Sequence, residues 1–255
     1  MALEEKSRID KSSHYLICPC KLVLDSSINI TIDLNYNIRM EVKFDAWDIA
    51  HITDYLLNDI KESLRVEVET AIQAYFTLNS TGKKGGGFYS IPRLIFPEID
   101  NLGSFLTGKP ESTGENITKY LKEVVSKIDK RYAEFAGFLV VIFRHGLLHQ
   151  HRPKTIIHKN KFVTSQIYIG SIYNPIELMR KNHLVFKGNL FLIDVNVLYI
   201  DILNSVDILI SEFSNGKYID TFNKSMKIQQ SPLLKSELLK KHQHYLVEDD
   251  FKFLG

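Results

Sequence analysis

The stretch that decides the fold runs from residue 117 to residue 147 and reads ITKYLKEVVSKIDKRYAEFAGFLVVIFRHGL. Its apolar residues recur at intervals of three and four, which is typical of an amphipathic helix. Beyond Tyr132 the stretch is apolar nearly all round, so we expect this part of the helix to be central and buried. Asn116 stands where an N-cap belongs, Gly137 is the position for a break, and Pro153 ends the helix.

The same periodicity predicts helices elsewhere in the chain. Residues 91–108, which precede the stretch quoted above, are hydrophobic but irregular, and Pro92 and Pro97 should prevent a long helix there. The helices predicted outside this region run from residue 47 to about 76, from 194 to 213 and, more weakly, from about 232 to 246.

Strand patterns are found at two places. Residues 28–44 alternate strictly between apolar and polar, which predicts β-structure with one buried face, as either a hairpin or one long bent strand. Residues 183–193 predict a hairpin that turns at Lys187-Gly188-Asn189. The fold class is therefore mainly α with added β (α+β): a helical bundle with an N-terminal β-stretch or hairpin and a small second hairpin. We expect one domain over residues 1–255, with a β-rich segment at 13–45 and a helical core at 46–250 that holds a hairpin insertion at about 155–193.

Composition favours a cytoplasmic globular protein. The chain has 255 residues, of which 44% are hydrophobic and 24% charged, and it shows neither a transmembrane stretch nor a signal peptide. Cys18 and Cys20 flank a single proline, which is unfavourable for a disulfide, and two cysteines are too few for a zinc set. We expect no cofactor and no membrane association.

The net charge of +2 conceals a basic segment. Residues 118–161 hold ten Lys or Arg against three Asp or Glu, a balance of +7. Such a segment is a candidate surface for phosphate groups. The alternative is a solvated helix face that acidic residues elsewhere in the fold balance.

One short stretch carries chemistry: residues 143–154, which read FRHGLLHQHRPK. Histidine can take a proton from a ribose 2′-hydroxyl and give one to the departing 5′-oxygen near neutral pH. Arginine can hold the phosphate with its planar fork. Arg144 and His149 are five residues apart and diverge by about 140° on an α-helix, so one copy supplies half a site and two copies related by a dyad supply a whole one.

The Arg144-x4-His149 spacing, with a polar residue after the arginine and an apolar helix before it, resembles the Arg-x4–6-His motif of HEPN domains. These helical domains occur in many prokaryotic toxin, CRISPR and abortive-infection ribonucleases. Residues 143–154 and the upstream phrase FPEIDNLG at residues 96–103 are also similar to phrases of uncharacterised bacterial HEPN-like proteins. The resemblance covers about residues 47–154.

The resemblance implies a HEPN-like helical bundle that forms a homodimer through the motif helices and cleaves RNA without metal. In that scheme Arg144 holds the scissile phosphate, His149 is the acid and base, and His145 takes the polar place after the arginine. The flanking His151, Arg152 and Lys154 are the candidate RNA contacts. A defence or toxin-like role, with an antitoxin or regulatory partner, belongs to the same expectation.

Three alternatives remain beside this hypothesis. His145 and His149 have the i, i+4 spacing of zinc ligands, with His151 or His158 as a third, but Gly146 replaces the glutamate of the His-Glu-x-x-His motif. A purely structural role would pair Arg144 with Asp100 or Glu98, while His149 caps its own helix. Some HEPN proteins are catalytically inactive, so an interaction or nucleotide-sensing module is the third alternative.

Overall fold

The structure, a computed structural model, describes residues 28–32, 38–42, 45–82, 89–148, 155–158, 161–170 and 175–231. The chain divides into two compact units, residues 1–44 and residues 45–255. The sequence instead predicts one domain, with the β-rich segment ending at residue 45 inside it. No described helix is both long and apolar enough to cross a lipid bilayer.

The first unit contains a β-hairpin. Strands β1 (Ile28–Ile32) and β2 (Ile38–Val42) pair antiparallel, so the strict alternation of this segment forms two strands and not one long bent strand. Because residues directly opposite each other lie on the same face of a sheet, the register matches apolar with apolar and polar with polar. The apolar pairs are Ile28 with Val42, Ile30 with Met40, and Ile32 with Ile38.

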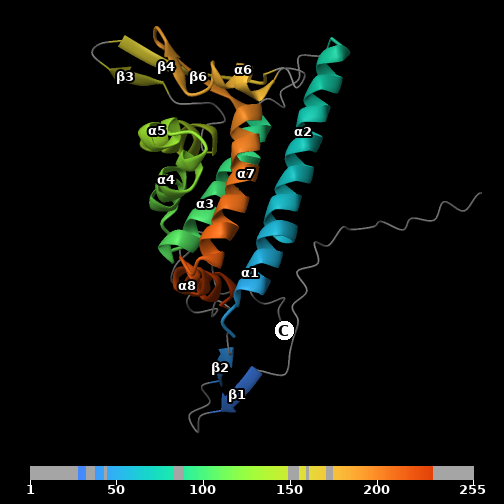
Figure 1. Cartoon of the computed structure of the whole chain (residues 1–255), viewed down its shortest axis with the longest axis vertical. Coiled ribbons are helices and arrows are strands. Elements are labelled where there is room, and N and C mark those ends of the chain that lie inside the picture. The colour runs from blue at the N-terminus through green and yellow to red at the C-terminus, as the bar shows by residue number, and fades with distance from the viewer. Residues whose placement is uncertain are drawn as a thin grey trace, which may run out of the picture. The chain divides into compact units, whose positions relative to one another are not determined.

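The second unit is mainly helical, and its described elements are labelled in Figure 1. The predictions of helices at residues 47–76 and 194–213 are confirmed, and the weaker helix at 232–246 lies outside the described residues. The helical elements are α1 (Ile49–Asp54), the π-helical η1 (Tyr55–Lys61), α2 (Glu62–Ser80), α3 (Ser90–Thr107), α4 (Thr113–Glu123), the 3-10 turn η3 (Val125–Lys127), α5 (Arg131–Leu139), the π-helical η4 (Val140–Leu148), α6 (Ile176–Arg180), α7 (Val195–Ser214) and α8 (Ile219–Gln230).

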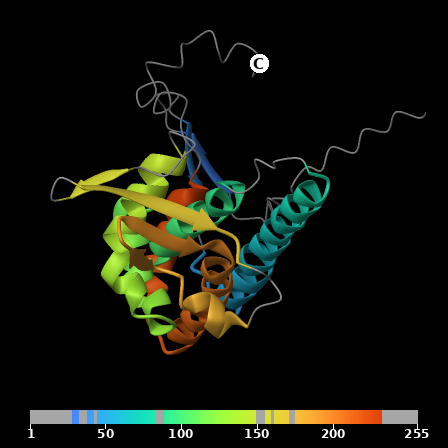
Figure 2. The same ribbon diagram turned by 90° about the horizontal axis from the view of Figure 1, so that it is seen from above.

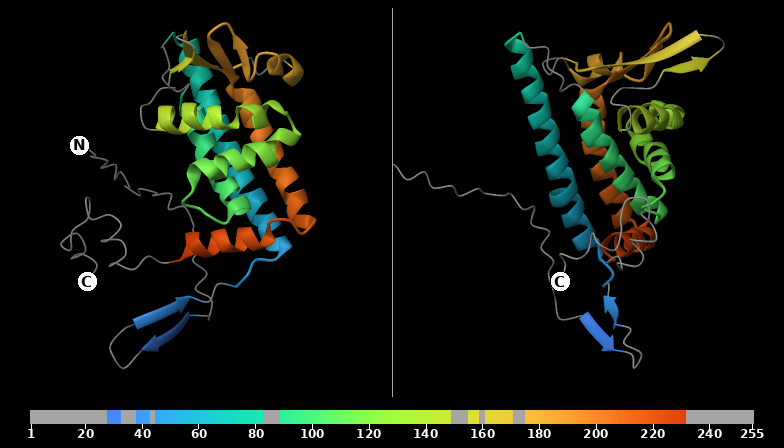
Figure 3. Two further views of the ribbon diagram at one scale, coloured as in Figure 1. Left: turned by 90° about the vertical axis from the view of Figure 1, so that its left-hand side faces the viewer. Right: turned by 180° about the vertical axis from the view of Figure 1, so that it is seen from behind.

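Helix α3 is the centre of this bundle. It contacts α2 and α7, which run alongside it, and α4, which lies on the side away from α2 (Figures 1 and 3). Helix α8 lies across one end of these helices, and the sheet covers the other end (Figure 1). The core between them is aromatic and aliphatic, with Phe105, Phe213 and Phe222 fully inaccessible to solvent.

The prediction that Pro92 and Pro97 prevent a long helix was wrong, because both lie within α3. Pro92 occupies the first turn, where a missing N–H costs nothing since that donor has no partner inside the helix. Pro97 lies in the interior, where it costs about 3 kcal/mol. Ten buried residues of α3 outweigh this cost through the apolar area that they remove from water.

The long helical stripe is interrupted at residues 124–130 and not near Gly137. Asp129 explains the new start, because its Oδ1 accepts the backbone N–H of Arg131 at the first turn of α5. Asn116 is not the N-cap either: α4 begins at Thr113, and Asn116 is fully buried inside it. The predicted burial beyond Tyr132 is confirmed for Leu139, Val140, Ile142 and Phe143, whereas Val141 remains 38% exposed.

A small mixed sheet completes the unit and confirms the α+β class (Figure 2). Its strands lie in the order β3-β4-β6-β5, and only β4 and β6 are parallel. The hairpin predicted at residues 183–193 is confirmed by β5 and β6, with Gly188 at φ +61° in the turn. The bounds are β3 (Ile156–His158), β4 (Lys161–Tyr168), β5 (Val185–Lys187) and β6 (Leu190–Asp194).

Candidate functional site

The motif arginine lies in η4, which continues α5 without interruption. The backbones of Arg144 and His145 are described, and their side chains are not. His149 and the three candidate RNA contacts lie outside the described residues; these contacts are His151, Arg152 and Lys154. Of the candidate site, the structure therefore describes the helix that leads into it.

Aromatic stacking ties that helix to the core. Phe143, the residue before Arg144, is 1% exposed and stacks on Phe96 of α3. The two ring centroids are 4.1 Å apart, and the ring planes are inclined by 17°. Stacked aromatic pairs contribute about 0.5–1.5 kcal/mol beyond the area that they bury. The backbone at Arg144 is thus fixed relative to α3 by its neighbour in the chain.

The phrase at residues 96–103 forms the joint between α3 and its neighbours. Phe96 holds η4, and the Asp100 carboxylate accepts a 3.0 Å hydrogen bond from the side-chain amide of Asn116. Gly103 lets the two helices approach closely: a Cβ added there would lie 2.2 Å from the carbonyl oxygen of Asn116. These contacts give most of the phrase a packing role next to the motif helix.

The structural alternative for Arg144 stays a prediction, because its side chain is not described. Of its two candidate partners, Glu98 accepts a hydrogen bond from Asn101 at 2.9 Å. Burial raises the pKa of Glu98, and the nearby Glu67 carboxylate adds to this effect. Asp100 faces α4 through its bond to Asn116.

Beside this joint lies a cavity of about 280 Å³ between α3 and α8. The amide of Gln229 spans part of it and donates to Ser104 and Ser225, both at 3.1 Å. The hydroxyls of these two serines also bond each other at 2.8 Å. The lining residues are Pro97, Asp100, Asn101, Ser104, Pro110 and Gln229.

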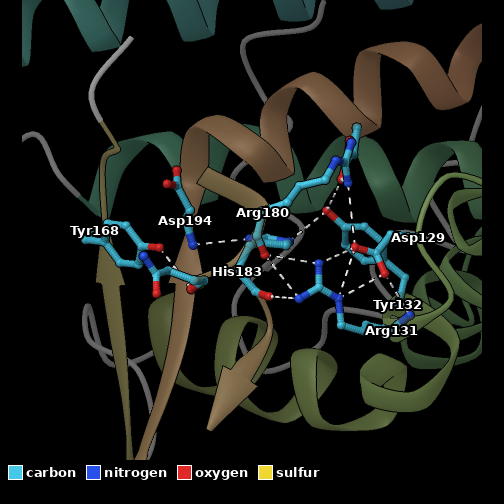
Figure 4. Close-up of polar contacts among 9 residues, drawn as sticks. Asp129, Arg131, Tyr132, Tyr168, Arg180, His183 and Asp194 are labelled. Carbon is cyan, nitrogen blue, oxygen red and sulfur yellow. Dashed lines mark hydrogen bonds and ion pairs between the residues drawn. The ribbon is translucent and has the colours of Figure 1, made fainter. Parts of the chain in front are cut away.

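A polar network that the sequence analysis missed joins α5, α6 and α7 (Figure 4). At its outer end, the guanidinium of Arg131 binds the carboxylate of Asp129 through Nε at 3.0 and 3.1 Å. The same guanidinium donates to the carbonyl oxygens of Arg180 and His183, at 3.2 and 2.6 Å from Nη1. Arg131 thereby fastens the segment after α6 to the start of α5.

The inner end of the network is a relay of hydrogen bonds with a defined direction. The Asp194 N–H donates to Nδ1 of His183 at 3.2 Å, so Nε2 carries the proton and donates to the Tyr132 hydroxyl at 2.9 Å. Tyr132 in turn donates to Oδ2 of Asp201 at 3.0 Å. Arg180 binds both oxygens of the same fully buried carboxylate, at 2.8 Å from Nη1 to Oδ2.

The electrostatics show that this network is structural. Burial, reinforced by the charge of Arg131, lowers the pKa of His183 to about 3, so the imidazole is neutral and both its nitrogens are occupied. Burial raises the pKa of Asp201, and Arg180 opposes that shift. Burial also acts to raise the pKa of Asp129, but hydrogen bonds from Arg131 outweigh it and the pKa is lowered. Two arginines thus neutralise two aspartates inside the fold.

Two signals in the sequence could have revealed part of this network. Asp201 interrupts the apolar α7 helix, where an unpaired carboxylate would be costly. Asp129 and Arg131 precede the most apolar helix of the chain. The partners that these residues have on other elements lie 21 to 69 residues away along the chain, so those pairings were not readable from local pattern.

The basic segment is used in part inside the fold. Lys127 forms an ion pair with Glu212, Lys119 donates to the carbonyl of Leu106 at 2.8 Å, and Arg131 belongs to the network. Of these three cations, Lys127 is the one whose partner is an acidic residue outside the segment, as the alternative of a balanced helix face expects.

Within the described part of the chain, no group of three or more His, Cys, Asp or Glu is placed to hold a metal ion. The zinc alternative at His145 and His149 stays a prediction. Comparisons with protein-family models, with curated proteins and with solved structures find no match to this chain. The resemblance to HEPN domains therefore rests on the motif and its helical setting.

Proposed function

We propose that this chain is a metal-independent endoribonuclease of HEPN type. In this proposal Arg144 binds the scissile phosphate and His149 moves the proton between the 2′-hydroxyl and the departing 5′-oxygen. His145, His151, Arg152 and Lys154 then contact the RNA around the cleaved bond. The observation that carries the proposal is the geometry of η4, the helix on which the arginine lies.

Arg144 lies in a helix of unusual geometry. In a π-helix each hydrogen bond joins residue i to residue i+5, so its turns are wider than those of an α-helix. Arg144 lies inside η4, which is described as far as Leu148. Wide helical turns of this kind are rare and are frequently found at functional sites.

The anchoring of η4 suits a catalytic role as well. An arginine contributes most to phosphoryl transfer when its fork is held in place before the substrate arrives. The stack of Phe96 on Phe143 fixes the backbone directly before Arg144.

The proposed enzyme acts as a homodimer, because one copy supplies only one arginine and one histidine of the motif. The apolar run at residues 138–143 gives limited support to this step. Leu139, Val140, Ile142 and Phe143 are buried in the chain's own core, and only Val141 is left 38% exposed. The dimer therefore rests on the half-site argument. We place such an enzyme in the cytoplasm, in a defence or toxin-like system with an antitoxin or regulatory partner.

The test is cleavage of labelled RNA in the presence of EDTA. We expect cleavage to persist, to leave a 2′,3′-cyclic phosphate and to peak between roughly pH 6 and 8. DNA should be inert because it lacks the 2′-hydroxyl. His149→Ala should lower the rate by about 10²-fold or more. Arg144→Lys should also be impaired, since an ammonium keeps the charge and loses the bidentate fork.

His51→Ala is the matched control, because His51 lies on α1 with a side chain that is 75% exposed. Equal rates for His149→Ala and His51→Ala would remove the enzyme and leave the inactive interaction or nucleotide-sensing module. Activity lost in EDTA and restored by zinc would assign His145 and His149 to a metal.

A further inference from the structure

The hairpin of the first unit is a sheet of two strands within the described residues (Figure 3). A two-stranded hairpin by itself is marginally stable in water, and three or more strands with a hydrophobic face are needed for independent stability. Pairing with further strands would therefore stabilise the hairpin.

The two faces of the hairpin differ sharply in polarity. The register assigns three apolar pairs to one face and two polar pairs to the other. On the polar face Arg39 stands opposite Thr31, and Glu41 stands opposite Asn29. Each charged residue of β2 thus has a neutral residue across from it within its own hairpin.

The edge of β2 that faces away from β1, which no described strand pairs with, is complementary to itself. Every second residue of a two-stranded antiparallel sheet directs its N–H and C=O away from the partner strand. When β2 pairs antiparallel with a second β2 about a dyad at Met40, all five of its residues are paired. Arg39 then stands opposite Glu41 of the second copy, and the dyad repeats this pair.

Charge selects that register over its neighbours. A dyad at Arg39 would place two arginines opposite each other, and a dyad at Glu41 would place two glutamates opposite each other. Like charges directly opposite each other in a sheet are destabilising, and unlike charges stabilise it. The edge of β1 offers no such selection, because its polar residues, Asn29 and Thr31, are neutral.

We propose that β2 is a self-association edge: two copies of this chain pair through Ile38–Val42 and form one four-stranded antiparallel sheet, β1-β2-β2-β1. The paired sheet has four strands in place of the two described in one copy, and its apolar face doubles from six residues to twelve. The proposal does not depend on ribonuclease activity, since none of its residues belongs to the Arg144 motif.

The first test is disulfide trapping in the full chain, with Cys18→Ser and Cys20→Ser as background. Residues opposite each other in an antiparallel pair have Cα atoms about 4.5–5.5 Å apart, within reach of a disulfide. Met40→Cys should therefore give a covalent dimer at low micromolar concentration. Ile30→Cys is the matched control: in the four-stranded sheet its two copies are three strand spacings apart, about 14 Å, and should not be trapped.

The second test is charge reversal, followed by sedimentation equilibrium. Arg39→Glu alone should raise the dissociation constant of the dimer by about tenfold or more, because two attractive pairs become repulsive. The double variant Arg39→Glu/Glu41→Arg restores both pairs and should return the constant to that of the wild type. Circular dichroism of the helices confirms that each variant is folded.

Trapping of Met40→Cys and Ile30→Cys to the same extent would overturn the proposal. A dimer that is indifferent to Arg39→Glu would also overturn it, and would show that association uses another surface such as η4, which leaves the ribonuclease proposal intact. A wild-type chain that sediments as a 29.4 kDa monomer at every concentration would refute self-association altogether.

Discussion

The contact between α3 and α4 at Gly103 permits a sharp prediction. A Cβ at this position would lie 2.2 Å from the carbonyl oxygen of Asn116 and 2.5 Å from its carbonyl carbon. Ordinary contact begins at 3.4 Å, so Gly103→Ala requires the two backbones to separate. Asn116 has little freedom to yield, because hydrogen bonds join its side chain to Thr107, Asp100 and the carbonyl of Lys109.

The magnitude follows from two opposing effects. Overpacking of a core costs about 1–3 kcal/mol and occasionally more, while replacing glycine by alanine inside a helix returns about 1 kcal/mol. Because the clash is between backbone atoms and not with a flexible side chain, we expect a net destabilisation of about 2–3 kcal/mol. For a unit of this size each kcal/mol corresponds to about 2–4 °C, so the Tm should fall by about 4–12 °C.

Thermal unfolding followed by circular dichroism is the assay, and Gly137→Ala is the matched control. Gly137 is also helical, but a Cβ there would meet no atom within 4 Å. Gly137→Ala should therefore stabilise the protein by about 0.5–1 kcal/mol through helix propensity alone. A Gly103→Ala protein that melts at or above the wild-type temperature would refute the close approach of α3 and α4.

Three further predictions concern the network and the start of α7. His183→Gln should flatten the pH dependence of stability. The pKa of His183 is about 3 in the folded protein against 6.5 ordinarily, so the stability that its neutral imidazole contributes above pH 6.5 is lost as the pH falls toward 3. Urea unfolding of the wild type and the variant across this pH range measures the difference. Arg180→Met should lower the free energy of unfolding by about 3 kcal/mol, since it leaves the fully buried Asp201 carboxylate without its cation; urea midpoints equal to those of the wild type would contradict that pairing. Asp194→Ala should cost about 1–2 kcal/mol in guanidinium unfolding, because Oδ1 of Asp194 accepts the N–H groups of Asn196 and Val197 as the N-cap of α7, and an unchanged midpoint would exclude that cap.

Local patterns in the sequence determined those helices and strands whose signal lies within one continuous stretch of residues. The alternation at residues 28–44 specified the apolar and the polar face of this segment, since a period of two allows one set of faces, and the structure then decided the pairing of its two strands. Gly188 marked the turn of the second hairpin because the turn needs a positive φ. The helices at residues 47–76 and 194–213 followed from their apolar stripes. The helix that carries Arg144 was likewise readable from its apolar stripe, and the motif on it stays a prediction.

Only the tertiary structure decided the features that depend on partners far along the chain. Helix α3 passes through Pro97 because burial against the helices around it outweighs one lost hydrogen bond. Asn116 is a buried link between α4 and α3, since Asp100 and Gly103 approach it from sixteen and thirteen residues away. The network around Tyr132 joins residues up to 69 positions apart. A buried charge needs a partner, but the fold decides which distant residue is brought next to it.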